Sequence, residues 1–198
     1  MKTEKLERQN VWFFNWLSKY YDAFLGNWNN KIFDEVFRTS KFRKGARILD
    51  AGCGTGNLLF YMHKKRKDIK LYGIDVSDKM LEIAGSKVKK VVLKKTSVEK
   101  FEFRKNYFDY IFSVDAFHHY SKPGIAMKNF LKVLKKNGKL VVIDFDFGFL
   151  NYLFHLFEPG NKKFYSASEI KNIFLGLGFR DVWQKKVGGF GVLTIGEK

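Results

Sequence analysis

The sequence predicts an α/β protein in which a mostly parallel, doubly wound sheet lies between two layers of helices. Three observations indicate this three-layer fold. Short apolar runs of strand length alternate with longer segments of helical periodicity through the middle of the chain. The first of these runs leads into a glycine-rich loop followed by a helix, and the last two runs follow one another with no helix between them, which predicts an antiparallel closing strand. At 198 residues, the chain has the size of one domain.

Each element follows from a local pattern. An aromatic-rich amphipathic helix is expected over 11–21 and a second helix over 29–39. Ser77 is suited to cap a helix, Ser166 and Glu169 form a capping box, and Gly138 is expected to stop the helix before the fifth strand. The expected strands are 47–50, 70–74, 91–93, 107–114, 139–144, 179–185 and 192–195, and the remaining helices are 58–67, the segment after Ser77, 123–134 and 166–177.

The glycine-rich loop carries the first functional signal. Gly52, Gly54 and Gly56 stand at every second position, so the spacing differs from the G-x-G-x-x-G of dinucleotide-binding proteins. Asp50, just before the loop, would repel a pyrophosphate and attract a cation. Asp75 closes the next strand, where a carboxylate accepts hydrogen bonds from both hydroxyls of a ribose. These residues predict a cationic nucleoside as the ligand.

Four stretches resemble a known family, the class I S-adenosylmethionine-dependent methyltransferases, which have a Rossmann-like fold. DAGCGTG is similar to the first motif of the family and YGIDVSDKMLEIA to the second. FDYIFSVDAFHHY, with the later LKKNGKLVV, resembles the region of the fourth and fifth strands. The resemblance covers roughly residues 45–146 and is nearest in appearance to the small single-domain branch that includes the ubiquinone and menaquinone C-methyltransferases.

The resemblance implies S-adenosylmethionine as the cofactor. Relatives usually place an acid near position 97 to hold the adenine amino group, whereas this chain has Ser97. A tyrosine ahead of the glycine loop lies near the methionine end of the cofactor in similar enzymes, and the residue at Met80 lies against the adenine. The cofactor-binding candidates are Tyr20, Tyr21, Asp50, Gly52, Cys53, Gly54, Gly56, Asp75, Val76, Met80, Ser97, Val98, Val114 and Asp115.

Two adjacent histidines are the candidates for catalysis. His118 and His119 follow the fourth strand at the carboxyl edge of the sheet, where ligands bind in doubly wound folds. Imidazole changes its charge near neutral pH, so either histidine could act as a base if the acceptor must lose a proton. Asp115, Asp146 and His155 are further candidates. No Cys or His spacing predicts a metal site, and the phosphate-binding motif of ATPases is absent.

The chain is interpreted as one methyltransferase domain over 1–198. Residues 1–44 are expected to form a helical lid, 45–146 the cofactor-binding core, and 147–198 the acceptor-pocket segment and closing strands. Tyr20 or Tyr21, with the aromatic run 147–157, is expected to close over the cofactor. We expect a cytoplasmic protein with no obligate protein partner, since the opening residues lack an apolar core of signal-peptide length and the single cysteine, Cys53, excludes an internal disulfide.

The acceptor is left open between two classes. Amino-directed DNA and RNA enzymes of the family carry Asn/Asp-Pro-Pro-aromatic after the fourth strand, and this chain has VDAF at 114–117, which favours a small molecule, apolar or lipid-like. The formal net charge of +17 keeps two alternatives open, an RNA methyltransferase that binds nucleic acid through its basic surface and peripheral contact with an anionic membrane. An NAD-dependent reductase and a non-enzymatic binding module are the remaining rivals.

Overall fold

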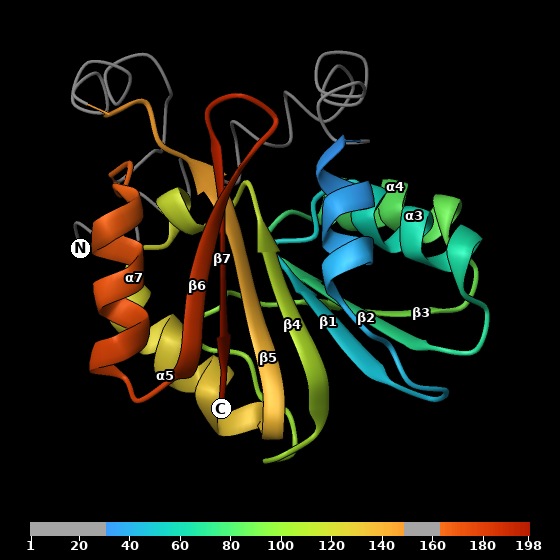
Figure 1. The fold of residues 1–198 in the computed structure, drawn as a ribbon. Helices are drawn as coiled ribbons and strands as arrows, with labels where there is room; N and C mark the ends of the chain where they lie inside the picture. The colour runs from blue at the N-terminus through green and yellow to red at the C-terminus, as the bar shows by residue number, and fades with distance from the viewer. Residues whose placement is uncertain (1–30, 149–162) are drawn as a thin grey trace.

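A computed structural model describes residues 31–148 and 163–198 and places a seven-stranded sheet between helices (Figure 1). The strands lie in the order β3-β2-β1-β4-β5-β7-β6. β1 to β5 pair in parallel, and β7 is antiparallel to both β5 and β6. The bounds are β1 Arg47–Ala51, β2 Lys70–Asp75, β3 Val91–Lys95, β4 Phe108–Val114, β5 Leu134–Phe145, β6 Arg180–Val187 and β7 Gly191–Glu197. The predicted fold class is confirmed.

The helices divide between the two faces of the sheet because neighbouring strand residues point to opposite sides. Ile48 packs in one apolar core with the helix at 31–39 and with α3, whereas Leu49 packs in the other core with α5 and α7. The helix bounds are α3 Asn57–Lys65, α4 Asp78–Lys87, α5 Pro123–Val133 and α7 Ala167–Gly176, with a short 3₁₀ turn η1 at Phe117–His119. The described chain therefore has helices on both faces, as expected.

The predicted caps are confirmed where helices α4 and α7 begin. Ser77 accepts a hydrogen bond from the backbone N–H of Met80 at 3.2 Å. The Ser166 hydroxyl accepts from the backbone N–H of Glu169, and Glu169 accepts in return from the backbone N–H of Ser166. Each pair satisfies N–H groups that a helix leaves unbonded at its first turn.

The fifth strand was predicted too short, and Gly138 does not stop the preceding helix. α5 ends at Val133, and β5 begins at the fully buried Leu134, which pairs with Phe108. The register then shifts, because Tyr110 pairs with Lys139. Residues 135–138 form this irregularity, in which Asn137 has a φ of 61° and the Gly138 carbonyl accepts from the Lys198 N–H. Similarly, α3 ends at Lys65 and not at the predicted residue 67.

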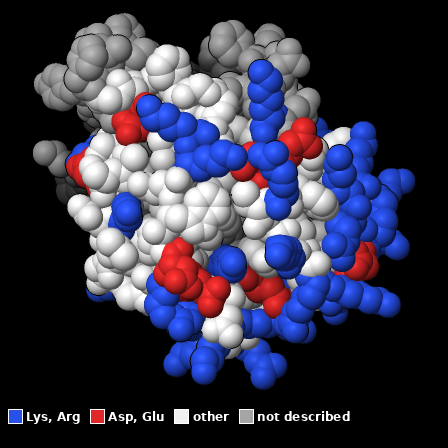
Figure 2. All heavy atoms as spheres, viewed as in Figure 1, with Lys and Arg blue, Asp and Glu red and all other residues white. Residues whose placement is uncertain are grey.

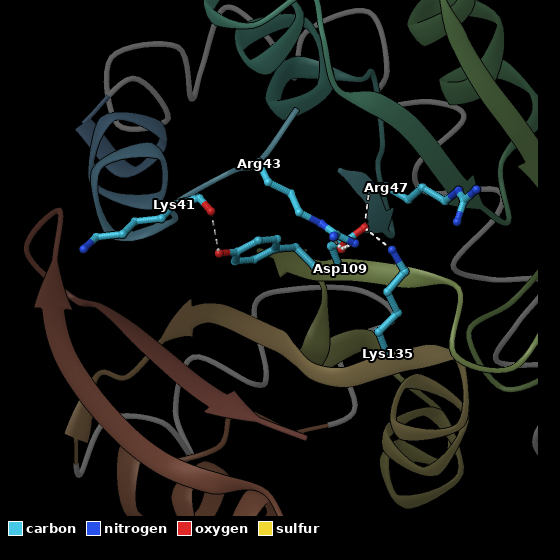
Figure 3. Close-up of polar contacts among 6 residues, drawn as sticks. Lys41, Arg43, Arg47, Asp109 and Lys135 are labelled. Carbon is cyan, nitrogen blue, oxygen red and sulfur yellow. Dashed lines mark hydrogen bonds and ion pairs between the residues drawn. The ribbon is translucent and has the colours of Figure 1, made fainter. Parts of the chain in front are cut away.

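Asp109 lies at the amino edge of the sheet, where the parallel strands begin, and its carboxylate connects several segments there. Its carboxylate accepts from Arg43 Nη2 at 2.8 Å, from the Arg47 backbone N–H at 2.9 Å and from Lys135 Nζ at 2.7 Å (Figure 3). Burial alone would raise the pKa of Asp109, but these three donors outweigh it and lower the pKa. One carboxylate thus links the segment before β1 with β1, β4 and β5, at the end of the sheet opposite the ligand edge.

Positive residues outnumber negative ones, and the formal net charge of the chain is +17. Figure 2 shows Lys and Arg gathered most densely along the right side and the lower edge of the viewed face, with fewer acidic residues among them and uncharged residues over much of the left and centre. Among residues 31–148 and 163–198, no helix is both long and apolar enough to cross a membrane. Several predicted features lie outside the described residues: the helix expected at 11–21, Tyr20, Tyr21, His155 and most of the run 147–157. The division of the chain into lid, core and pocket segment therefore stays a prediction.

Candidate cofactor site

The loop between β1 and α3 is shaped by close approaches that only glycine permits. Gly52 has a φ of 77°, and a Cβ there would lie 2.8 Å from the Cβ of Ala116. Gly56 has a φ of 76° at the start of α3, and its Cβ would lie 2.8 Å from the Cβ of Ala84 on α4. Gly52 thereby lets the loop approach the segment after β4, and Gly56 lets α3 pack against α4.

Asp75 joins the end of β2 to this loop. Its Oδ2 accepts from the Gly54 backbone N–H and its Oδ1 accepts from the Ser77 backbone N–H, both at 2.9 Å. Burial raises the pKa of Asp75, and the N–H groups of Ser77, Gly54 and Val76 oppose that rise. Since each carboxylate oxygen has a second lone pair, both remain able to accept from a ribose.

Asp50 is a buried acid one residue before the end of β1. Its exposed fraction is 3%. Burial, and then repulsion from Asp75, raise the pKa of Asp50 to about 8. A positively charged ligand beside Asp50 would favour its ionised form, so the site gains from binding a cation.

Two cavities meet at the glycine loop and share Gly52, Gly54 and Asp115. The larger has a volume of about 780 Å³ with its open mouth included, and the smaller about 380 Å³. The larger is further lined by Ile74, Asp75, Val76, Met80, Thr96, Ser97, Val98, Glu99, Ala116, His119, Tyr120 and Ser121. The smaller is further lined by Phe33, Asp50, Cys53, Thr55, Asn57, Leu58 and Val114.

Of the described cofactor-binding candidates, only Gly56 lines neither cavity. Of the described catalytic candidates, His119 and Asp115 line the larger cavity, whereas His118 and Asp146 line neither. Sequence reasoning missed Thr96, Glu99, Tyr120 and Ser121. Thr96 and Glu99 flank the predicted pair Ser97 and Val98, and Tyr120 and Ser121 follow the two histidines directly. Their position in the sequence, next to predicted residues, was the available signal, but the sequence pattern could not show which side chains face the cavity.

The two histidines have different surroundings. His119 lines the larger cavity, whereas His118 is 1% exposed and lines neither. Asp144, at the end of β5, holds His118 twice, through Oδ1 at 2.6 Å from Nδ1 and through Oδ2 at 2.8 Å from the backbone N–H. The rings of His118 and His119 lie 4.0 Å apart between centroids. His119 is therefore the histidine that a ligand can reach, and His118 belongs to the wall behind it.

One cluster of side chains has the composition of a metal site. Asp115, His118 and Asp144 each have an atom that can coordinate a metal ion, and these three atoms lie within 4.8 Å of one another. Asp144 Oδ1 also accepts from the Phe145 backbone N–H at 2.9 Å, so both of its oxygens already take part in hydrogen bonds. The arrangement is that of a buried, hydrogen-bonded His–Asp pair.

The cavity residues fit a cationic nucleoside. Asp50 offers a carboxylate to a cation, and Asp75 offers one to a ribose. Ser97 Oγ is buried and has no hydrogen-bond partner among the described residues, so it is available to a base. The three polar groups occur along the two adjoining cavities, in a sequence that matches a sulfonium, a ribose and a purine.

This strand order and glycine loop, with the acid that ends β2, define the protein as a class I S-adenosylmethionine-dependent methyltransferase. Residues 42–188 match a family model described as a methyltransferase domain, and the chain belongs to that family.

Several curated proteins are similar to the chain. The chain is 34% identical over 101 residues to the uncharacterized methyltransferase YdaC of Bacillus subtilis, and this match covers 50% of the chain and 56% of YdaC. It is 33% identical over 110 residues to phosphoethanolamine N-methyltransferase 1 of Triticum aestivum, covering 52% and 21%. It is 24% identical over 162 residues to demethylmenaquinone methyltransferase of Thermotoga maritima, covering 82% and 61%. The matches thus span less than two thirds of each of these relatives.

Among solved structures, a SAM-dependent methyltransferase from Aquifex aeolicus superposes with a TM-score of 0.69 at 26% identity. That match covers 83% of this chain and 88% of the Aquifex chain. The expectations of a methyltransferase and of S-adenosylmethionine as its cofactor are confirmed.

Proposed function

We propose that the protein transfers a methyl group to a small-molecule acceptor, apolar or lipid-like, and that His119 receives the proton when the acceptor must lose one. The observation that carries the proposal is the placement of His119 and Asp115 directly after β4, in the wall of the larger cavity. Asp115 also lines the smaller cavity, so this wall faces the place where the two meet.

Bound S-adenosylmethionine supplies a methyl group on a positively charged sulfur, which is displaced in line by the acceptor. The residues of the chain contribute position and charge. Asp75 holds the ribose, Asp50 stabilises the cationic end, and the glycine loop lets both approach closely. Orientation of two reactants alone contributes up to roughly 7–11 kcal/mol. His119 adds a base within reach of the cavity.

Two features support a small, largely apolar acceptor. The larger cavity has apolar side chains in its wall, among them Ile74, Met80 and Val98. Behind His119, Phe164 packs on the buried His118 with ring centroids 4.9 Å apart, and Phe147 packs on Phe164 at 5.4 Å. An apolar wall backed by packed aromatic rings suits an apolar ligand and excludes water. Relatives named for demethylmenaquinone and phosphoethanolamine methylation indicate small molecules as the acceptor class.

The test is a screen with radiolabelled methyl donor against an isoprenoid-substituted quinol, phosphoethanolamine and total RNA. We expect label on a small molecule, with the quinol preferred. His119→Ala should lower the rate by about 10²- to 10⁴-fold without changing the affinity for S-adenosylhomocysteine. His63→Ala on α3, which lines neither cavity, is the matched control.

Label on RNA alone would contradict the acceptor class. An undiminished rate in His119→Ala on an acceptor that loses a proton would contradict the role of the histidine and leave the acceptor class standing.

A further inference from the structure

The hairpin that joins β6 to β7 ends in an exposed aromatic side chain. Phe190 is 64% exposed, the largest fraction among the exposed large apolar side chains of the described residues. It follows Gly188 and Gly189, whose φ angles of 58° and 93° let the chain reverse tightly. The Phe190 carbonyl accepts from the Asp146 backbone N–H at 2.9 Å, and its ring packs on Phe147 with centroids 5.5 Å apart. The exposed ring is therefore held at a defined place.

The hairpin lies at the same edge of the sheet as the two cavities. Figure 1 shows it at the upper end of the sheet, where β5 ends. Gly191, the first residue of β7, pairs with Phe145, the last residue of β5. Phe147, which packs on Phe190, also packs on Phe164, the ring behind the histidines of the larger cavity. A surface on which the hairpin rests would therefore face the edge where ligands bind.

Two lysines flank the hairpin, one on each face of the sheet. Lys185 Nζ lies 2.7 Å from Glu35 Oε1, on the helix at 31–39, and Lys186 points to the opposite face because strand residues alternate. Glu35 also pairs with Arg38, so two cations share one carboxylate and one positive charge remains. Lys186 is exposed, and no acid of the described residues forms an ion pair with it.

The ring and the two lysines border one hollow between the hairpin and the end of β5. Phe190, Lys185 and Lys186 all line it. The acid in its described lining is Asp146, whose carboxylate accepts from the backbone N–H groups of Gly148 at 2.9 Å and Ala167 at 2.8 Å. The hairpin thus combines an exposed aromatic ring with positive charge, on a chain whose formal net charge is +17.

An anionic bilayer matches this combination better than a nucleic acid does. A ring at the tip of a hairpin can enter the boundary between headgroups and acyl chains, while lysines beside it reach the phosphates. Single-stranded nucleic acids are bound instead by successive rings along a positively charged groove. We propose that the β6–β7 hairpin is the surface by which the protein rests on an anionic lipid bilayer, with Phe190 among the acyl chains and Lys185 and Lys186 at the headgroups.

This inference goes beyond the proposed function and gives a lipid-like acceptor a source. An acceptor dissolved in the bilayer would meet the protein at the edge of the sheet that carries His119. Binding to a bilayer is measured without methyl donor or acceptor. Its failure would therefore leave the proposed function standing, and failure of methyl transfer would leave the bilayer contact standing.

The experiment is co-sedimentation of the full chain with vesicles of phosphatidylcholine alone and of phosphatidylcholine mixed with phosphatidylglycerol. We expect binding to the anionic vesicles only, weakening as salt is added. Phe190→Ala should weaken binding by about tenfold to a hundredfold, because burial of its ring is lost, and Lys186→Gln by about fivefold. Both variants should keep the native thermal midpoint, because both side chains are exposed.

Leu175→Ala is the matched control. Leu175 is 52% exposed at the end of α7, close to the start of β6 and so at the opposite edge of the sheet, and its loss should leave binding unchanged. A polarity-sensitive dye on Phe190→Cys should shift its emission to the blue with anionic vesicles, whereas the same dye on Leu175→Cys should not. The native Cys53 is buried, so the dye reacts at the introduced thiol.

Undiminished binding in Phe190→Ala, or equal weakening in Leu175→Ala, would overturn the role of the hairpin. A native protein that does not bind anionic vesicles at low salt would overturn the bilayer contact itself. Loss of RNA binding in Phe190→Ala, with vesicle binding unchanged, would also overturn it and would assign the hairpin to a nucleic acid.

Discussion

Replacing Asp50 by Asn tests the electrostatics of the site without any ligand. Asp50 is buried beside Asp75, and its pKa of about 8 means that the folded protein keeps this carboxyl protonated at neutral pH. A neutral amide has nearly the same shape as a protonated carboxyl, so Asp50→Asn should fold normally. The substitution removes only the possibility of ionisation.

The expected magnitude follows from proton linkage. In the unfolded chain an aspartate ionises near pH 3.9, whereas in the folded protein Asp50 ionises near pH 8. Between these values the folded state binds more protons than the unfolded state, so the free energy of unfolding falls as the pH rises. Each pH unit contributes about 1.4 kcal/mol at most, which gives on the order of 5–6 kcal/mol over the whole window.

The assay is urea unfolding of the native protein and of Asp50→Asn at several values from pH 5 to pH 9. The variant should be more stable, and its advantage should grow with pH up to about pH 8 and then level off. Glu82→Gln, an exposed position on α4, is the control and should show no such growth. An advantage that is constant, or largest at low pH, would refute the assignment of a raised pKa to Asp50.

The remaining predictions concern packing, the amino edge and the surface. Asp109→Ala should lower the free energy of unfolding by about 1–3 kcal/mol at pH 7. Because the pKa of Asp109 is lowered in the folded protein, this loss of stability should shrink as the pH falls below about 4. A loss of stability that persists in acid would be inconsistent with the lowered pKa. Gly56→Ala should lower the free energy of unfolding, measured by chemical denaturation, by about 2–5 kcal/mol, because Gly56 has a positive φ and an added Cβ would collide with Ala84. The control Gly124→Ala, where a Cβ meets open space, should cause no loss of stability. Equal effects of the two substitutions would contradict the packing argument. Binding to RNA, measured by fluorescence anisotropy, should weaken by orders of magnitude from low to physiological salt, and a shallow dependence would indicate a specific site.

Much of the fold could be predicted because local chemistry and long-range packing agree. Ser77 and Ser166 carry capping side chains at the positions where helices begin, and Ile48 and Leu49 are apolar because each faces a different helical layer. Gly138 misled the prediction, since glycine after an apolar helix usually marks its end. Here Gly138 serves a strand irregularity set by pairing between β4 and β5, and that pairing is not visible in the local sequence.

The site could be predicted only in part for a similar reason. The glycine spacing and the two acids near the carboxyl ends of β1 and β2 identify the ligand edge, because the position of a residue along a parallel strand fixes the edge of the sheet at which it lies. Nothing in the adjacent pair His118 and His119 says which ring faces the cavity. That depends on Asp144, 26 positions away from His118, whose carboxylate holds one ring in the wall. Glu99 was missed because its carboxylate is held by the backbone N–H groups of Ser121 and Lys122, just before α5, and this long-range contact is not visible in the local sequence.

The most direct test of a nucleoside site built on Asp75 and the glycine loop is calorimetric titration with S-adenosylhomocysteine, S-adenosylmethionine and NADH. The native protein should bind the first two and not NADH. Asp75→Ala should lose on the order of 2–4 kcal/mol of binding free energy, because two hydrogen bonds from the ribose to the carboxylate are removed. Binding of NADH without S-adenosylmethionine would contradict the account as a whole, and unchanged affinity in Asp75→Ala would contradict the placement of the ribose.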